Sequence, residues 1–311
     1  MRIVFIGTGE IGVPTLRALL RSTQHELLGV VTQPDKPAGR DQRMQAPPIK
    51  AELHETSTPI LQPARMRNEE TIEQIRALKP EVIVVMAYGQ ILPKSVLEIP
   101  RVACLNLHAS LLPRHRGAAP IQAAIVAGES QTGITVIYMD EGLDTGDVLL
   151  QSKLEISPNE TGGSLHDRLA AIAPAPLLEA LDQLAAGTAL RTPQNSALAT
   201  YAPKLGREDG KIDWTESAEV IERKIRAFDP WPGAFTQLTD ISGKVRNLKV
   251  FRASVVENQA GDPGSVSRPN DEVVVATGKD ALRLDEVQLE GKQRMRAAEF
   301  LRGFSSPINH F

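Results

Sequence analysis

The sequence predicts a two-domain α/β protein, with a doubly wound, mostly parallel sheet (Rossmann-like) in the N-terminal domain and a smaller antiparallel β-barrel after it. In the N-terminal half, apolar β-branched runs alternate with helical stretches, which is the pattern of a sheet covered by helices on both faces. Beyond residue 207, short strand-like runs are separated by glycine-rich turns, as in small barrels. The length of 311 residues also fits two domains at roughly 150 residues each.

The N-terminal domain is expected to begin with a strand, a tight glycine turn and a helix. The apolar run at residues 2–6 leads into GTGEIG at residues 7–12 and then into helical spacing at residues 14–20. A further helix is predicted at residues 69–78. The other predicted strands of this domain are residues 27–32, 82–87, 103–108 and 133–139.

The glycine turn by itself does not establish a dinucleotide site. An NAD site needs an acidic residue about 20 positions past the glycines. This chain has Thr32, Gln33 and Pro34 there, and Asp35 comes only at the start of a proline-rich loop. The same glycines also serve a tight strand-to-helix turn, so NAD binding is disfavoured.

The predicted domain boundary falls in a polar stretch that contains glycine and proline. The helical segment at residues 165–186 must break or kink at Pro174 and Pro176. A helix at residues 217–228 then precedes the strands of the barrel. These strands are expected at residues 234–238, 245–256, 272–277 and 281–289. We expect an N-terminal domain over residues 1–189, a linker over 190–206 and a barrel domain over 207–311.

The composition is that of an ordinary globular protein. Apolar residues make up 41% and charged residues 23% of the chain, which argues against a disordered or fibrous protein. The single cysteine, Cys104, excludes an internal disulfide and fits a reducing compartment. No stretch reaches the roughly 18 consecutive apolar residues of a membrane span, so a cytoplasmic location is expected.

The net charge of −3 argues against a uniformly basic nucleic-acid binder, but basic residues gather locally. One cluster lies in the loop from Lys36 to Lys50. Taken alone, each cluster is explained by solvated surface charge. The other two clusters are Lys244, Arg246, Lys249 and Arg252, and Lys292, Arg294, Arg296 and Arg302.

Polar side chains gather where two predicted strands end. Asn106 and His108 close the fourth strand and share one of its faces, because alternate residues of a strand point to the same side. The fifth strand leads into an acidic loop, MDEGLDTGD at residues 139–147, which contains Asp144. In a doubly wound sheet, ligands bind at the carboxyl ends of the strands. The acidic loop lacks the ligand spacing of a calcium loop, and no other spacing implies a metal.

An amide, an imidazole and a carboxylate at one edge of a sheet suit acyl transfer to an amine. Asn106 and a protonated His108 could donate hydrogen bonds to the oxyanion of a tetrahedral intermediate. Asp144 could take a proton from the amine and favour the charged form of His108. The structural alternative is that these residues cap a turn, sit buried and satisfied, and form an Asx-turn.

Several long motifs resemble those of the folate-dependent formyltransferases. These are NLHASLLP at residues 106–113, RGAAPIQ at 116–122 and the acidic loop at 139–147. TQPDKPAGR at 32–40 and IRAFDPWP at 225–232 are similar to the members that act on methionyl-tRNA. The resemblance covers nearly the whole chain, and no catalytic position departs from the family pattern.

The resemblance implies which residues carry the chemistry of the N-terminal catalytic domain. It assigns catalysis to Asn106, His108 and Asp144. It assigns the folate site to a short loop whose apolar side chains and backbone suit a flat heterocycle. These loop residues are Ser110, Leu111, Leu112 and Pro113. The implied donor is 10-formyltetrahydrofolate, consumed as a cosubstrate, and no metal is implied.

The resemblance also implies an RNA partner, methionyl initiator tRNA. The C-terminal domain would be an open barrel of the oligonucleotide-binding (OB-like) type that binds tRNA, and Arg40 would reach the acceptor stem. Lys244, Arg246 and Lys249 are expected to contact phosphates, since phosphate contacts dominate RNA affinity. A monomer without membrane attachment is expected.

Three alternatives remain from the sequence. A formyltransferase acting on an amino sugar nucleotide would share the three catalytic residues, but it has no need of the basic loop from Lys36 to Lys50. A formyltetrahydrofolate hydrolase could deliver water with the same residues, but it has no evident use for a basic barrel. An RNA-binding or NAD-binding module without catalysis would leave the polar residues structural.

Overall fold

The computed structural model describes residues 1–39, 41–239, 242–304 and 308–311. Its contacts divide the chain into two compact units, which are described separately below. The first consists of Met1–Pro120, Gln131–Glu155 and His166–Ala202, and the second of Ile121–Ser130, Ile156–Leu165 and Pro203–Phe311. The domain limits drawn from the sequence at residues 189 and 207 stay a prediction.

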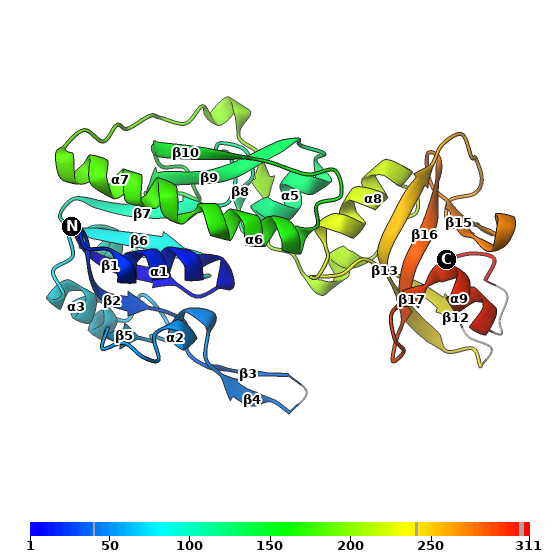
Figure 1. Ribbon diagram of the computed structural model, residues 1–311, viewed down its shortest axis with the longest axis horizontal. Helices are drawn as coiled ribbons and strands as arrows, with labels where there is room; N and C mark the ends of the chain where they lie inside the picture. The colour runs from blue at the N-terminus through cyan, green and yellow to red at the C-terminus, as the bar shows by residue number, and fades with distance from the viewer. Residues whose placement is uncertain (40, 240–241, 305–307) are drawn as a thin grey trace. The chain divides into compact units, whose positions relative to one another are not determined.

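The first unit is built on a seven-stranded sheet with the order β10-β9-β7-β6-β1-β2-β5 (Figure 1). Its pairs from β7 through β6, β1 and β2 to β5 are parallel, which confirms the mostly parallel α/β prediction. The strands are β1 (Arg2–Gly7), β2 (Glu26–Val31), β5 (Ile60–Leu61), β6 (Val82–Met86), β7 (Ala103–His108), β9 (Gln131–Tyr138) and β10 (Val148–Glu155).

The far end of this sheet runs the other way. Strand β9 pairs antiparallel with β7, and β10 pairs antiparallel with β9. Strand β10 was not among the predicted strands. Its exposed and half-buried residues mostly alternate, as on an edge strand with one solvated face. The sequence predicted a mostly parallel sheet without saying which strand would run the other way, because apolar content does not encode strand direction.

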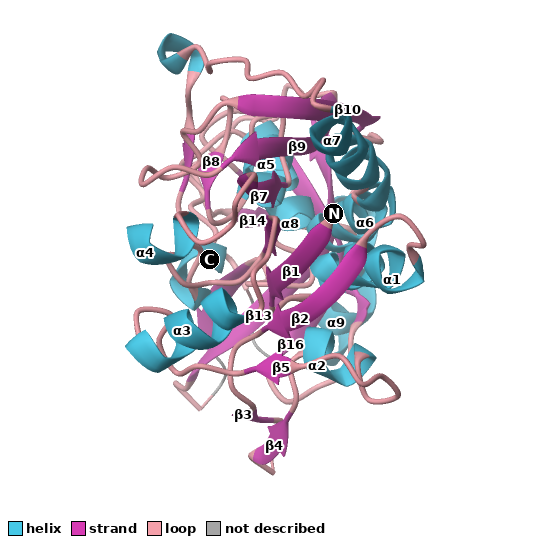
Figure 2. Cartoon of the chain, turned by 90° about the vertical axis from the view of Figure 1, so that its left-hand side faces the viewer, coloured by secondary structure: helices cyan, strands magenta, loops and turns pink. Residues whose placement is uncertain are grey.

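Helices cover both faces of the sheet, as a doubly wound fold requires. Helices α1 and α7 lie on one face, and α3 and α4 lie on the other (Figure 2). Core side chains of β1, β6 and β7 alternate between the two faces, and Val4, Ile83 and Cys104 belong to the cluster that includes α3 and α4. The helices are α1 (Val13–Arg21), α2 (Pro48–Glu52), α3 (Glu69–Ala77), α4 (Lys94–Leu97) and α7 (Pro174–Ala186).

Two small two-stranded sheets complete the first unit. Strands β3 (Lys36–Ala38) and β4 (Arg43–Gln45) form an antiparallel hairpin inside the basic loop. Strand β8 (Arg116–Gly117) pairs in parallel with β11 (Tyr201–Ala202). The second pairing joins the segment after β7 to the stretch that the sequence presents as a linker.

The second unit contains a curled antiparallel half-barrel, which confirms the predicted C-terminal fold. Helix α8 (Ala218–Ala227) places Ile221 and Ile225 in a core with residues of β13 and β16. Both of these strands match their predicted ranges. The remaining elements are β12 (Phe235–Thr239), β13 (Val245–Val256), β14 (Val266–Ser267), β15 (Val273–Ala276), β16 (Ala281–Leu289), β17 (Met295–Arg296) and α9 (Ala297–Gly303), with α5 (Pro120–Val126) from earlier in the chain. Helix α6 (Gly162–Ile172) begins in this unit, but most of it belongs to the first unit.

One apolar stretch, formed by two consecutive helices, bears on the expected absence of a membrane span. Among the described residues, Gly162–Ala186 is long and apolar enough to cross a membrane, by length and composition alone. It comprises α6 and α7, which meet at the predicted break before Pro174. Leu169, Leu177 and Leu181 of this stretch are fully buried within the protein. The core helix of a globular protein meets the same criteria, so this finding is weak evidence for a span.

Candidate active site

Asn106 and His108 lie at the end of β7, where the parallel part of the sheet meets its antiparallel end. Asn106 is paired with Val85 of β6 and with Ile137 of β9, so its backbone is held from both sides. His108 is opposite Thr135 and is 5% exposed. The strand pleat gives both side chains the same face, as predicted.

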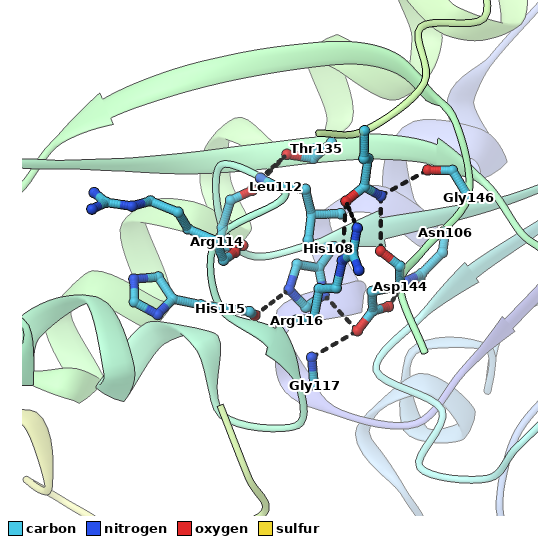
Figure 3. Close-up of polar contacts among 12 residues, drawn as sticks. Asn106, His108, Leu112, Arg114, His115, Arg116, Gly117, Thr135, Asp144 and Gly146 are labelled. Carbon is cyan, nitrogen blue, oxygen red and sulfur yellow. Dashed lines mark hydrogen bonds and ion pairs between the residues drawn. The ribbon is translucent and has the colours of Figure 1, made fainter. Parts of the chain in front are cut away.

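The carboxylate of Asp144 connects these two residues (Figure 3). Its Oδ1 accepts a hydrogen bond from Asn106 Nδ2 at 3.2 Å, and its Oδ2 lies 3.6 Å from His108 Nδ1. Oδ2 also accepts a hydrogen bond from the backbone N–H of Gly117 at 2.8 Å. The structure thus brings together the three residues that the sequence singled out, and it adds a backbone donor from β8.

The path of the chain from the end of β9 to Asp144 differs from the one expected. Because β9 is antiparallel, its carboxyl end lies beside Leu105 in the middle of β7, and not at the edge where β7 ends. The loop after β9 therefore has to travel back toward His108. The backbone N–H of Tyr138 donates to Asp147 O at 2.9 Å, which closes this loop at its base.

The backbone conformation of this loop is restricted at two positions. Asp144 has a φ of 53°, in the left-handed region that non-glycine residues adopt at a cost. A Cβ atom at Gly146 would lie 1.7 Å from the carbonyl oxygen of Tyr138. Only glycine allows the chain to turn this close to β9, so the sequence motif reflects a steric requirement.

Burial and two neighbours control the protonation of His108. Its Nε2 lies 2.8 Å from the carbonyl oxygen of His115, an acceptor, so Nε2 carries the hydrogen. Burial lowers the pKa of His108 below its usual value, and the Asp144 carboxylate opposes that effect only in part. The lowered pKa favours the neutral imidazole, whose Nδ1 then presents a lone pair toward Asp144. A protonated His108 during the reaction stays a prediction.

The loop predicted to hold folate follows directly after His108. Ser110 and Leu112 are buried, whereas Leu111 and Pro113 are half-buried. The Ser110 hydroxyl donates to Arg114 O at 2.7 Å and so closes the turn. Leu111 packs over β9 at Gly133, where a Cβ would lie 2.7 Å from Leu111 Cδ2. The loop thus presents Leu111 and Pro113, while Ser110 and Leu112 fix its shape.

Two residues that hold this loop were missed in the sequence. Thr135 Oγ1 donates to Ser110 O at 2.6 Å and accepts from Leu112 N at 3.1 Å. Gln151 Nε2 donates to Leu112 O at 2.9 Å and to Thr135 Oγ1 at 3.1 Å. The available signal was a threonine inside the apolar run of β9, and β10 was not predicted at all.

A third missed residue, Gln194, lies in the predicted linker. Its Nε2 donates to the carbonyl oxygens of Asp144 at 2.8 Å and Gly146 at 2.7 Å. Its Oε1 accepts from Arg116 Nε at 3.1 Å and from Arg116 Nη2 at 2.8 Å. Nothing in the local sequence indicated this role, because the partners are 50 and 78 residues away.

The residues predicted to contact tRNA that the structure describes are not gathered on one surface. Arg40 lies outside the described residues. On β13, Arg246 and Lys249 point to opposite faces of the sheet, because successive residues of a strand alternate. Lys244 directly precedes this strand. For metals, the described part of the chain holds no group of three or more His, Cys, Asp or Glu side chains suited to an ion.

Comparison with protein families identifies the chain. The formyl transferase family model matches residues 1–181, and the model of the formyl transferase C-terminal domain matches residues 204–305. A methionyl-tRNA formyltransferase from Akkermansia muciniphila is 47% identical over 305 residues, which cover 97% of this chain and 96% of the relative. The chain belongs to the methionyl-tRNA formyltransferase family. A second member, from Geobacter sulfurreducens, is 46% identical over 98% of this chain and 94% of its own.

Solved structures of formyltransferases share the fold. A methionyl-tRNA formyltransferase from Clostridium thermocellum has a TM-score of 0.56 at 21% identity and covers 83% of this chain and 95% of its own. The sugar 3N-formyl transferase WlaRD has a TM-score of 0.65 at 16% identity, over 94% of this chain and 99% of its own. HypX from Aquifex aeolicus, solved with tetrahydrofolic acid, has a TM-score of 0.62 at 21% identity and matches all of this chain over 48% of its own. At these identities the likeness concerns the fold alone.

Proposed function

We propose that this enzyme transfers the formyl group of 10-formyltetrahydrofolate to the amino group of methionyl initiator tRNA, for the initiation of protein synthesis. The observation that carries the proposal is the contact of the Asp144 carboxylate with Asn106 and His108, next to the loop of Leu111 and Pro113. The names of relatives that are 46–47% identical over nearly the whole chain support the tRNA acceptor over an amino sugar nucleotide or water.

The proposed reaction begins with attack of the amine nitrogen on the formyl carbon. A C–N bond forms, and negative charge develops on the formyl oxygen. Nδ2 of Asn106 carries two hydrogens, of which one is donated to Asp144, so the other can stabilise the oxyanion. The amide is oriented by a carboxylate that is itself held by Gly117, so little reorganisation is needed in the transition state.

The proton of the attacking amine passes to the pair formed by Asp144 and His108. The neutral Nδ1 of His108 faces Asp144 Oδ2, and a proton that arrives between them is shared by the two groups. When the intermediate collapses, the bond from the formyl carbon to N10 of the folate breaks. N10 then takes the proton from the pair, so one proton is lost and one is gained.

The folate is proposed to bind beside Leu111 and Pro113, which supply apolar walls near the strand end. Ser110 and Leu112 would act through the shape of the loop. Because the acceptor is a tRNA, we place the enzyme in the cytoplasm, where translation begins. A monomer remains our expectation for its solution state.

A direct assay tests this function. The protein is incubated with 10-formyltetrahydrofolate and one of three acceptors: methionyl initiator tRNA, an amino sugar nucleotide, or water alone. We expect formyl-methionyl-tRNA to form at least about 100-fold faster than either other product, since the tRNA amine is the nucleophile that the site is proposed to hold. Preferential formylation of the sugar would overturn the proposed acceptor.

Arg40 is proposed to act on the acceptor stem and not on the folate. The guanidinium of an arginine can bind phosphates or base edges with two hydrogen bonds. We expect Arg40→Ala to lower kcat/KM for methionyl-tRNA by about 10-fold or more, the scale of one strong charged contact. Folate binding and the slow hydrolysis of the donor should be retained. Loss of folate binding in this variant would move Arg40 to the donor site.

A further inference from the structure

The segment Thr192–Ala202, hereafter the strap, fastens both loops of the candidate site. At one end, Thr192 exchanges backbone hydrogen bonds with Val148, at 2.8 and 3.0 Å. Val148 directly follows the acidic loop at residues 139–147, which is called the Asp144 loop from here on. At the other end, Thr200 O accepts from Arg116 N at 2.9 Å, and Ala202 O accepts from Ala118 N at 2.8 Å. The strap therefore bridges the loop after β7 and the loop after β9.

Gln194 is the side chain of the strap that reaches the Asp144 loop. A glutamine amide offers two donor hydrogens and one acceptor oxygen. The donors go to the carbonyls of Asp144 and Gly146, and the oxygen receives two N–H groups of Arg116. A guanidinium has donors only, so Arg116 determines which way the amide faces. Gln194 therefore presents its NH₂ group, and not its oxygen, to the loop.

We propose that Gln194, oriented by Arg116, is a positioning residue that holds the Asp144 carboxylate against Asn106 and His108. Asp144 has left-handed backbone geometry, and a loop with such strain stays in place only if its surroundings hold it. The backbone of Asp144 and Gly146 is held by Gln194, while the side chain of Asp144 is left to contact the catalytic groups. The tests below that measure kcat rest on the proposed function.

The first test separates turnover from binding. Gln194→Met is neutral and of similar length but has no donor for the two carbonyls. We expect kcat to fall by about 10- to 100-fold, since small misplacement of a catalytic group is costly. KM for both substrates should stay within about 2-fold. Gln183→Met on α7 is the matched control, because Gln183 is also half-buried and its side-chain amide donates to Glu179, away from the candidate site. Thermal unfolding checks that both variants fold.

The second test asks whether Gln194 acts through Asp144. In an Asp144→Asn background, Gln194→Met should cause no further loss of kcat beyond about 2-fold, because the group that it positions is already gone. Gln194→Glu keeps an acceptor for Arg116 but turns a carboxylate oxygen toward the two carbonyls. We expect it, like Gln194→Met, to lower kcat when Asp144 is present and to cause no further loss in the Asp144→Asn background. Fully additive losses in the double variants would overturn the proposal.

The third test needs no substrate and so distinguishes a wrong inference from a wrong function. The imidazole of His108 is titrated by NMR and assigned with a His108→Gln variant. Burial lowers the pKa of His108, and the Asp144 carboxylate raises it. The backbone carbonyl of His115 also raises this pKa, whereas the charge of the His115 side chain lowers it. If Gln194→Met lets the carboxylate move away, the pKa of His108 falls further. An unchanged titration of His108 in Gln194→Met would overturn the role of Gln194 in holding the carboxylate, whatever the acceptor proves to be.

Discussion

Asp144→Asn is expected to lower kcat for formyl transfer by about 100- to 1000-fold, the scale of losing a general base. The amide is nearly isosteric with the carboxylate, so the contacts to Asn106 and Gly117 can be retained in part. The neutral amide cannot accept the proton of the attacking amine. Because the amide lacks the negative charge that raises the pKa of His108, that pKa should fall in this variant. Single-turnover formylation of methionyl-tRNA measures the loss.

The same loop offers a matched control for this substitution. Glu141 is an exposed carboxylate whose ion pair, at 3.3 Å, is with Lys94. We expect Glu141→Gln to keep kcat within about 2-fold, since an exposed ion pair contributes little. Folate affinity should be similar in both variants. A turnover number for Asp144→Asn equal to that of the unaltered enzyme would remove Asp144 from the mechanism.

Reversing the charge of Lys244, Arg246 and Lys249 together is expected to flatten the salt dependence of tRNA binding. Each phosphate contact contributes about 0.7 to 0.9 to the slope of log affinity against log salt concentration. If all three residues contact phosphates, the slope should fall by about 2 to 3. Binding titrations between low and moderate salt provide the slope.

Single substitutions sharpen this experiment, because Arg246 and Lys249 lie on opposite faces of β13. An RNA that runs along one face would respond to one of the two single reversals and not to the other. Lys153→Glu on β10 serves as the control, because Lys153 is exposed and belongs to none of the three basic clusters. A slope that none of the reversals changes would mean that β13 does not contact the tRNA.

The parts of the fold that sequence could predict are those written in short, local patterns. Strands β7, β13 and β16 match their predicted ranges, because apolar residues recur along each of them and polar or turn-forming residues lie nearby at both ends. The shared face of Asn106 and His108 follows from the strand pleat alone. These features require no knowledge of what lies across the sheet.

The features that sequence could not predict depend on distant partners. The reversed direction of β9 is set by its pairing with β7. The hydrophobic pattern of β9 would be the same for either strand direction. Burial lowers the pKa of His108 and so favours its neutral form, and a carbonyl that lies seven positions along the chain determines which nitrogen carries the hydrogen. Gln194 sits in a stretch with the composition of a linker, and only the folded chain shows that its amide reaches Asp144.

The strap also determines when, during its own synthesis, the protein can assemble its site. Strand β7 and the Asp144 loop leave the ribosome first, but their fastening waits for Gln194, Thr200 and Ala202, because a chain emerges from its N-terminus. A nascent chain that has reached only residue 189 would already carry Asn106, His108 and Asp144. It would still lack every strap contact described above, so the site cannot be completed before the strap has been synthesised.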